Sequence, residues 1–274
     1  MQQLENLPWY TYAILIIVIV SYIIRYFLKA KEGYDENSTF KAKFKKSANS
    51  TLDKNQLFAI AFYTPISEWW EADTNTLGFL KAKDILPYLE GWGIDTKVGY
   101  WDLTEYFMKD GRRWYFDFIY NMIQHEPKEQ WAILMAEKFG TNERAYNYLD
   151  QLKTGETLQK LKQNGILTFD SELDLGVTAY DAAVLVGQAR KAYTANIISE
   201  EEAWKVIQFA RELAVQHFSS WDEFGKSLAL GFALDFAPDR RESAKEYKEG
   251  VFHIYKQVVE DPASPWNTIS WPKE

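Results

Sequence analysis

The chain has 274 residues, a formal net charge of −8 and no cysteine. The lack of cysteine excludes a disulfide scaffold, a cysteine nucleophile and a thiolate metal site. With 47% hydrophobic and 26% charged residues the composition is that of a folded protein, and the 16% of aromatic residues predicts a core or an interface anchored on large rings.

The N-terminal segment is the most apolar part of the chain. Residues 7–24 carry no charge, and the apolar character continues to Leu28 with Arg25 as the interruption. At ~1.5 Å per residue, a helix of this length crosses a hydrocarbon core of ~30 Å. We therefore expect residues 1–30 to form a single transmembrane anchor with its flanks, in contact with the lipid bilayer through residues 7–28. A cleaved signal peptide is a weaker interpretation, because no basic residue precedes the stretch, and a buried core helix is another.

The charges beside this stretch set its expected orientation. Residues 1–50 contain seven basic and four acidic residues, which leaves a net charge of −11 for the rest of the chain. All seven basic residues lie at or after Arg25, so the positive-inside rule places the following domain in the cytoplasm, anchored by a single pass in a bacterial inner membrane. The composition of residues 31–51 predicts a basic and polar linker. Its lysines are either simply exposed to solvent or attracted to anionic lipid headgroups.

Beyond residue 51 the apolar residues recur with helical spacing. In residues 201–218 the apolar side chains are three and four positions apart, so on a helix they would form one apolar stripe. Ser199 followed by Glu202 is a capping box and predicts the start of this helix, and Ser220 with Glu223 predicts the start of the next. Further helices are expected over residues 97–109, 112–124, 127–139, 142–152 and 178–193.

The expected fold class is therefore all-α. It comprises an N-terminal transmembrane helix, a linker and a multi-helix globular domain over residues 52–274. We expect eight to ten helices in one domain or in two tightly packed halves. Only residues 165–169 have a composition typical of a β-strand, and this segment is too short to change the expected fold class.

Local motifs of catalysis and ligand binding are missing from the sequence. His125, His217 and His253 form no paired metal-ligand spacing, so neither a metal site nor a cofactor is expected. His217 adjoins the apolar stripe, where a hydrogen-bonded, partly buried histidine is the simpler interpretation. Glycine-rich phosphate loops, nucleotide fingerprints and nucleophile elbows do not occur. The acidic body argues against nucleic acid as a partner, because binding phosphates requires a basic face.

Four tryptophans stand in turn-like contexts: Trp92, Trp221, Trp266 and Trp271. A buried indole N–H needs an acceptor, so a tryptophan beside Ser, Asp or Asn can hold two segments together. We favour a structural role, in which these rings pin helix ends into the core. The alternative is an exposed aromatic anchor that binds a partner.

Six segments carry a family resemblance. They are LEGWGI at 89–94, the Gly111-Arg112-Arg113 turn, GVTAYDAAVLVGQAR at 176–190, ISEEEAW at 198–204, FSSWDEFGKSLALG at 218–231 and DPASPWNTISW at 261–271. Together they cover most of residues 80–271 and resemble the bacterial domain-of-unknown-function family 1266. In that family the 176–190 segment tends to read Trp-Asp, with an arginine three positions after the Asp. Here Tyr180 and Val184 replace the tryptophan and the arginine while Asp181 is retained, which puts any role of that arginine in doubt.

The resemblance implies no activity. Some members of the family lie near secreted-toxin loci, which implies an immunity or interaction role. The polar residues that match the family's segments are Asp181, Arg190, Glu202, Ser220 and Asp222. A buried network that holds helices in register explains them without chemistry, because a half-made buried charge pair costs ~3–5 kcal/mol.

These observations favour a membrane-anchored helical domain that binds a protein partner. An immunity-type binder of a basic toxin is one form of this function, because an acidic surface complements a basic one. The alternative is a membrane-associated enzyme of unknown reaction, with Asp181, Arg190 and Asp222 as candidate catalytic residues in a helical pocket. A scaffold of an envelope complex is the third hypothesis.

Overall fold

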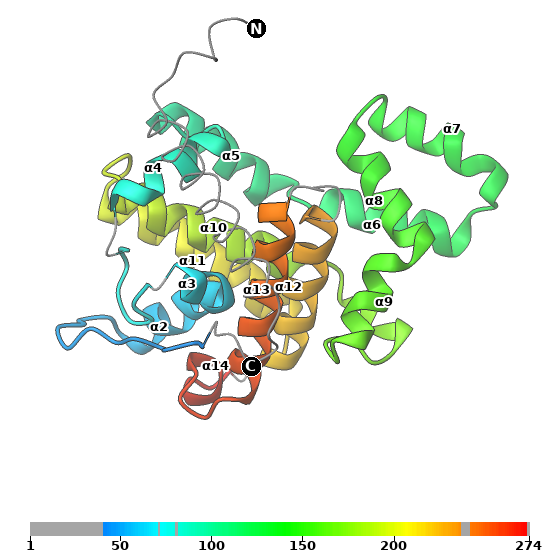
Figure 1. Ribbon diagram of the computed structural model, residues 1–274. Helices are drawn as coiled ribbons and strands as arrows, with labels where there is room; N and C mark the ends of the chain where they lie inside the picture. The colour runs from blue at the N-terminus through cyan, green and yellow to red at the C-terminus, as the bar shows by residue number, and fades with distance from the viewer. Residues whose placement is uncertain (1–40, 71, 80–81, 237–241, 273–274) are drawn as a thin grey trace, which may run out of the picture. The chain divides into compact units, whose positions relative to one another are not determined.

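The computed structural model describes residues 41–70, 72–79, 82–236 and 242–272 (Figure 1). Over these residues the chain forms thirteen α-helices and two 3-10 helices and has no strand, which confirms the all-α prediction. The elements are α2 (Lys54–Ile60), η1 (Ala61–Tyr63), α3 (Thr64–Trp69), α4 (Ala82–Gly91), α5 (Lys97–Lys109), α6 (Arg113–His125), α7 (Lys128–Phe139), α8 (Glu143–Thr154), α9 (Glu156–Gln163), η2 (Asp170–Leu175), α10 (Thr178–Thr194), α11 (Glu200–His217), α12 (Trp221–Phe236), α13 (Glu242–Glu260) and α14 (Pro265–Thr268).

The transmembrane part of the predicted fold class requires correction. Among the described helices, none is long and apolar enough to cross a lipid bilayer. The segment on which the prediction rested, residues 7–28, lies outside the described residues. The fold class is therefore an all-α domain to which no membrane-spanning helix is assigned.

The described part of the predicted linker, residues 41–51, is attached to the helical domain. The Ala42 amide donates to the Gln257 side chain, and the Lys43 amide donates to the Glu68 carboxylate, both at 2.8 Å. The Ser47 amide donates to Asn75 Oδ1 at 2.7 Å. This stretch therefore has defined partners on α3, α13 and the segment after α3.

Helix starts follow the local capping signals. At α11, Ser199 Oγ accepts the Glu202 amide and the Glu202 carboxylate accepts the Ser199 amide, so the predicted capping box is confirmed. At α12, Ser220 Oγ accepts the Glu223 amide at 3.2 Å, but the Glu223 carboxylate accepts from the amide and hydroxyl of Ser219. The second box is thus half formed, and the helix still starts where the sequence predicts.

Helix α10 lies at the centre of the described domain. Fifteen of its 17 residues are buried, and it packs against α11, α12, η1, α4 and α5 (Figure 1). Helices α6 to α9 form a second group that packs on α12 through α8 and α9. A helix that is covered on every side must satisfy each of its polar side chains within the protein.

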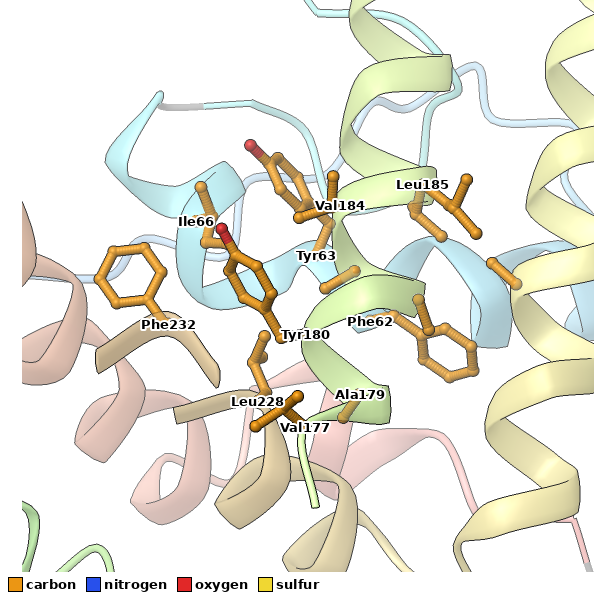
Figure 2. Packing of buried hydrophobic residues seen from close by; sticks show 14 of the residues in the cluster. Phe62, Tyr63, Ile66, Val177, Ala179, Tyr180, Val184, Leu185, Leu228 and Phe232 are labelled. Atoms are coloured by element: carbon orange, nitrogen blue, oxygen red, sulfur yellow. The ribbon is translucent and has the colours of Figure 1, made fainter. Parts of the chain in front are cut away.

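Two helical glycines allow the closest approaches to this core. A Cβ at Gly231 of α12 would lie 2.4 Å from the Tyr180 Cβ, and a Cβ at Gly187 of α10 would lie 2.3 Å from the Tyr63 ring. Figure 2 shows Tyr180 and Phe232 together on one side of α10. Their ring centroids lie 6.5 Å apart in an edge-to-face arrangement. The glycines therefore set the spacing between α10 and its neighbours.

We expect Gly231→Ala to destabilise the protein by ~1–3 kcal/mol, because the added methyl group overpacks the α10–α12 contact. The matched control is Gly91→Ala, where a Cβ meets no atom within 4 Å. The control should leave stability unchanged or raise it by up to ~1 kcal/mol, because alanine favours helix. Urea denaturation of both variants measures the difference, and a Gly231→Ala variant as stable as the parent contradicts this account of the packing.

Candidate functional site

Asp181, in the first turn of α10, is completely buried and accepts three hydrogen bonds. Its Oδ1 accepts the Arg112 amide at 2.8 Å, and its Oδ2 accepts the Arg113 amide at 3.0 Å and the Arg113 Nη1 at 2.9 Å. Gly111 has a φ of 63°, and a Cβ there would lie 2.2 Å from Asp181 Oδ2. Burial raises the pKa of Asp181 to about 6, against the opposing effect of the Arg112 and Arg113 donors. The glycine lets the carboxylate cap the start of α6.

Arg113 extends this contact to a third helix. Its Nη1 also donates to the Phe107 carbonyl at 2.8 Å, and its Nη2 donates to the Met108 and Lys109 carbonyls at 2.7 and 3.1 Å. These carbonyls belong to the last turn of α5, where an arginine also complements the helix dipole. Asp181 and Arg113 thus join the end of α5, the start of α6 and the start of α10.

A second ion pair, Arg112 with Asp235, lies beside the first. Arg112 Nε lies 2.7 Å from Asp235 Oδ1, and the two side chains are only 8% and 6% exposed. Asp235 also accepts from Arg144 and, at 2.7 Å, from the Tyr180 hydroxyl. Burial alone would lower the pKa of Arg112, but Asp235 and Tyr180 raise it overall, so the guanidinium stays charged. The pair connects α12 to α6, α8 and α10.

Asp235 stands in none of the sequence motifs and was not among the predicted site residues. The usable signal was its position: it follows the apolar run 228–234 near the end of α12. A carboxylate that directly follows an apolar stretch of a helix is either exposed to solvent or paired with a buried cation. The cation, Arg112, is 123 positions away in the chain, so the sequence alone did not connect them.

Arg190, near the other end of α10, binds backbone carbonyls. Its Nε donates to Leu77 at 3.1 Å, and its Nη2 donates to Asp73 and Thr76 at 3.0 Å. The guanidinium carbon lies 4.7 Å from the centre of the Phe79 ring. Burial lowers the pKa of Arg190 to about 10. This side chain therefore holds the segment between α3 and α4 against α10.

Lys191 is buried next to Arg190. Its Nζ donates to the Tyr63 hydroxyl and lies 4.3 Å from the ring centres of both Tyr63 and Tyr88. Burial, followed by the neighbouring Arg190 charge, holds the pKa of Lys191 well below its usual range. Aromatic faces thus surround the Lys191 amino group, and no carboxylate lies within ion-pair distance of it in the described structure.

The structure does not bring the three predicted catalytic residues together. Nine positions separate Asp181 from Arg190, or ~14 Å along α10. Asp222 is exposed in the first turn of α12 and pairs with Lys226 at 2.7 Å. Arg112 instead joins Asp181 to Asp235, which is thirteen positions or ~20 Å along α12 from Asp222.

Three of the four predicted tryptophan anchors pack against one another. The Trp221 ring stacks on Trp266 at 5.2 Å and meets Trp271 edge-on at 5.0 Å. Each indole N–H donates to a backbone carbonyl: Trp221 to Ile269 at 2.7 Å, Trp266 to Ala61 at 2.8 Å and Trp271 to Phe218 at 2.9 Å. Residues 264–271 are thereby attached to η1 and to the junction of α11 and α12. Trp92 is half-buried elsewhere, beside Tyr88 and Phe107.

An open pocket of about 360 Å³ lies next to the Asp181 junction, where the ends of α5, η2 and α11 meet the starts of α6 and α10. Its charged and aromatic lining consists of Lys109, Asp110, Arg113, Trp114, Asp117, Asp174 and His217. Asp174 Oδ1 accepts the Tyr120 hydroxyl at 2.9 Å, and His217 Nδ1 lies 2.8 Å from the Leu213 carbonyl, to which it donates in the matching tautomer. The surrounding protein raises the pKa of Asp117 by desolvation, although Arg113 and His217 oppose this shift. Nowhere in the described chain do three His, Asp or Glu side chains gather as a metal site.

Fold and site define an all-α domain whose buried charges tie its helices together around one central helix. The family described as "Protein of unknown function (DUF1266)" matches residues 89–271, about two thirds of the chain. The chain belongs to this family, as the sequence resemblance predicted. No curated protein and no solved structure matches it. The matched region contains both ion pairs and the four tryptophans.

We expect Asp235→Asn to destabilise the protein by ~3–5 kcal/mol, because it leaves the buried Arg112 guanidinium without a counter-charge. Asp222→Asn on the same helix is the matched control, since that carboxylate is 68% exposed and its pair with Lys226 is a surface pair. Loss of the Asp222–Lys226 pair should lower the free energy of unfolding by less than ~1 kcal/mol. Chemical denaturation at neutral pH compares the two, and equal losses would show that the Arg112–Asp235 pair is not a structural contact.

The lowered pKa of Lys191 predicts that the stability of the protein depends on pH. Its folded pKa lies below that of the unfolded lysine, about 10.4, so between these values the unfolded chain binds more protons. The free energy of unfolding, relative to Lys191→Met, should therefore rise with pH from 7 to 9.5, by up to about 1.4 kcal/mol per pH unit. Denaturation curves of both proteins at matched pH values test this. A constant difference over that range means that Lys191 keeps an ordinary pKa in the fold.

Proposed function

We propose that this domain binds a protein partner that presents a basic surface. The buried charges of Asp181 and Arg190 hold helices and their adjoining segments together, and the candidate catalytic residues do not converge. The chain after residue 50 has a net charge of −11. An acidic surface of this kind attracts basic partners and increases their rate of association.

The outer face of α5 is the single observation that carries this proposal. Its inner face, with Tyr100 and Phe107, is buried in the domain. On the outer face Val98, Asp102 and Glu105 are all exposed, Val98 to 70%. Their spacing of four and three positions aligns them along one side of the helix.

This stripe of Val98, Asp102 and Glu105 has the chemistry of a docking surface. A large exposed aliphatic side chain gains free energy when a partner covers it, and the two carboxylates select for positive charge on that partner. The helix itself is held in place at both ends. Lys97 pairs with Glu202 of α11 at 2.6 Å, and Arg113 caps the last turn. A toxin domain with a basic face is one partner of this class.

We expect the chain, tagged at its C-terminus, to capture a basic protein whose binding weakens as the salt concentration rises from ~50 to ~300 mM. With the purified partner, the double variant Asp102→Asn/Glu105→Gln should reduce affinity at least ~10-fold, which corresponds to ~1.4 kcal/mol. The measurement is isothermal titration calorimetry.

The matched control is Asp150→Asn/Glu156→Gln, which removes two exposed carboxylates from α8 and α9 and changes the net charge equally. It should alter affinity less than ~3-fold, because those charges lie outside the α5 stripe. Equal effects of the two double variants contradict the assignment of the stripe. An acidic partner contradicts the proposal as a whole.

A further inference from the structure

The pocket beside the Asp181 junction contains carboxylates that accept no hydrogen bond within the described structure. Within the described structure, neither Asp110 nor Asp117 forms a side-chain hydrogen bond or an ion pair, although both line the pocket. Asp174, the third carboxylate of the lining, accepts a hydrogen bond from Tyr120. By contrast, Asp181 and Asp235 each accept hydrogen bonds from two or more donors.

The arginine in the pocket wall acts on Asp117 through its charge, but it donates no hydrogen bond to the pocket carboxylates. The Arg113 Nη1 and Nη2 groups donate to Asp181 and to three carbonyls of α5, and its side chain is only 13% exposed. Its charge is offset by Asp181, so three carboxylates remain in the pocket lining beside Lys109 and His217. This balance favours a ligand with a positive charge.

The remaining walls suit an organic cation. Trp114 lines the pocket, and its ring already accommodates the Lys138 ammonium at 5.4 Å from the ring centre. Ligand pockets commonly enclose ~300–1,000 Å³. At about 360 Å³ this pocket is at the small end of that range, so it matches one long side chain rather than a folded segment.

We infer that the pocket receives the guanidinium or ammonium group of one arginine or lysine side chain of the basic partner. This inference rests on the proposed function and adds a specific contact to it. Lys109 and Asp110 of the pocket directly follow the outer face of α5, so one partner can cover the stripe of Val98, Asp102 and Glu105 and insert a side chain into the pocket. Arginine is a frequent anchor of such interfaces when it fills a pocket.

The first test uses a small probe and does not require the partner. The full chain is titrated with Nα-acetyl-arginine methyl ester and with the matching citrulline ester, which has the same shape but no charge, and binding is followed by NMR. The arginine ester should bind at least 5-fold more tightly than the citrulline ester. Asp117→Asn, and separately Asp110→Asn, should remove that preference, while Asp150→Asn should retain it. Equal binding of the two esters, or an unchanged preference in Asp117→Asn and Asp110→Asn, overturns the inference.

The second test separates this inference from the proposed function. Asp117→Asn should weaken binding of the purified partner at least 5-fold while its thermal unfolding midpoint stays that of the parent. If the α5 double variant weakens binding of the partner and Asp117→Asn does not, the proposed function stands and the pocket inference fails. If the arginine ester binds but no basic protein is captured, the pocket takes a free organic cation, and the assignment to a partner side chain is wrong.

Discussion

The fold depends on a helix that is buried on every side and nevertheless carries ionisable side chains. Helix α10 has 15 of its 17 residues buried, among them Asp181, Arg190 and Lys191. Each of these groups would cost several kcal/mol if it were left unsatisfied. Each is therefore compensated by a different segment: the start of α6, the carbonyls before α4, and the aromatic rings of Tyr63 and Tyr88. The central helix thus specifies where its neighbours attach.

The same compensation shapes the candidate binding site. Because Asp181 and the last turn of α5 occupy the Nη donors of Arg113, that arginine lines the pocket without donating a hydrogen bond to its carboxylates. Asp110, at the end of α5, and Asp117, on α6, therefore line the pocket without a hydrogen bond in the described structure. The structural role of Asp181 and the proposed binding role of the pocket therefore arise from one junction.

Local features of this fold were predictable from the sequence, and distant pairings were not. The bounds of α5 and the start of α11 at Ser199 follow from periodicity and capping, which involve neighbours a few positions apart. The short helices α2 to α4 and α9 were missed, because segments of six to ten residues carry little periodic signal, and the longer α13 was missed as well. Asp181 and Arg190 were expected in a buried network and are buried, whereas Asp222 is a surface residue. The pairing of Arg112 with Asp235 spans 123 positions and leaves no local pattern.

A double-mutant cycle between Asp181 and Arg113 tests the central claim most directly. Unfolding free energies of the parent, Asp181→Asn, Arg113→Met and the double variant give the coupling between the two side chains, separate from the other contacts that each makes. If the buried charge of α10 holds α5 and α6 in place through this pair, the coupling should be ~1–3 kcal/mol. Additive single effects, within ~0.5 kcal/mol, would contradict the account.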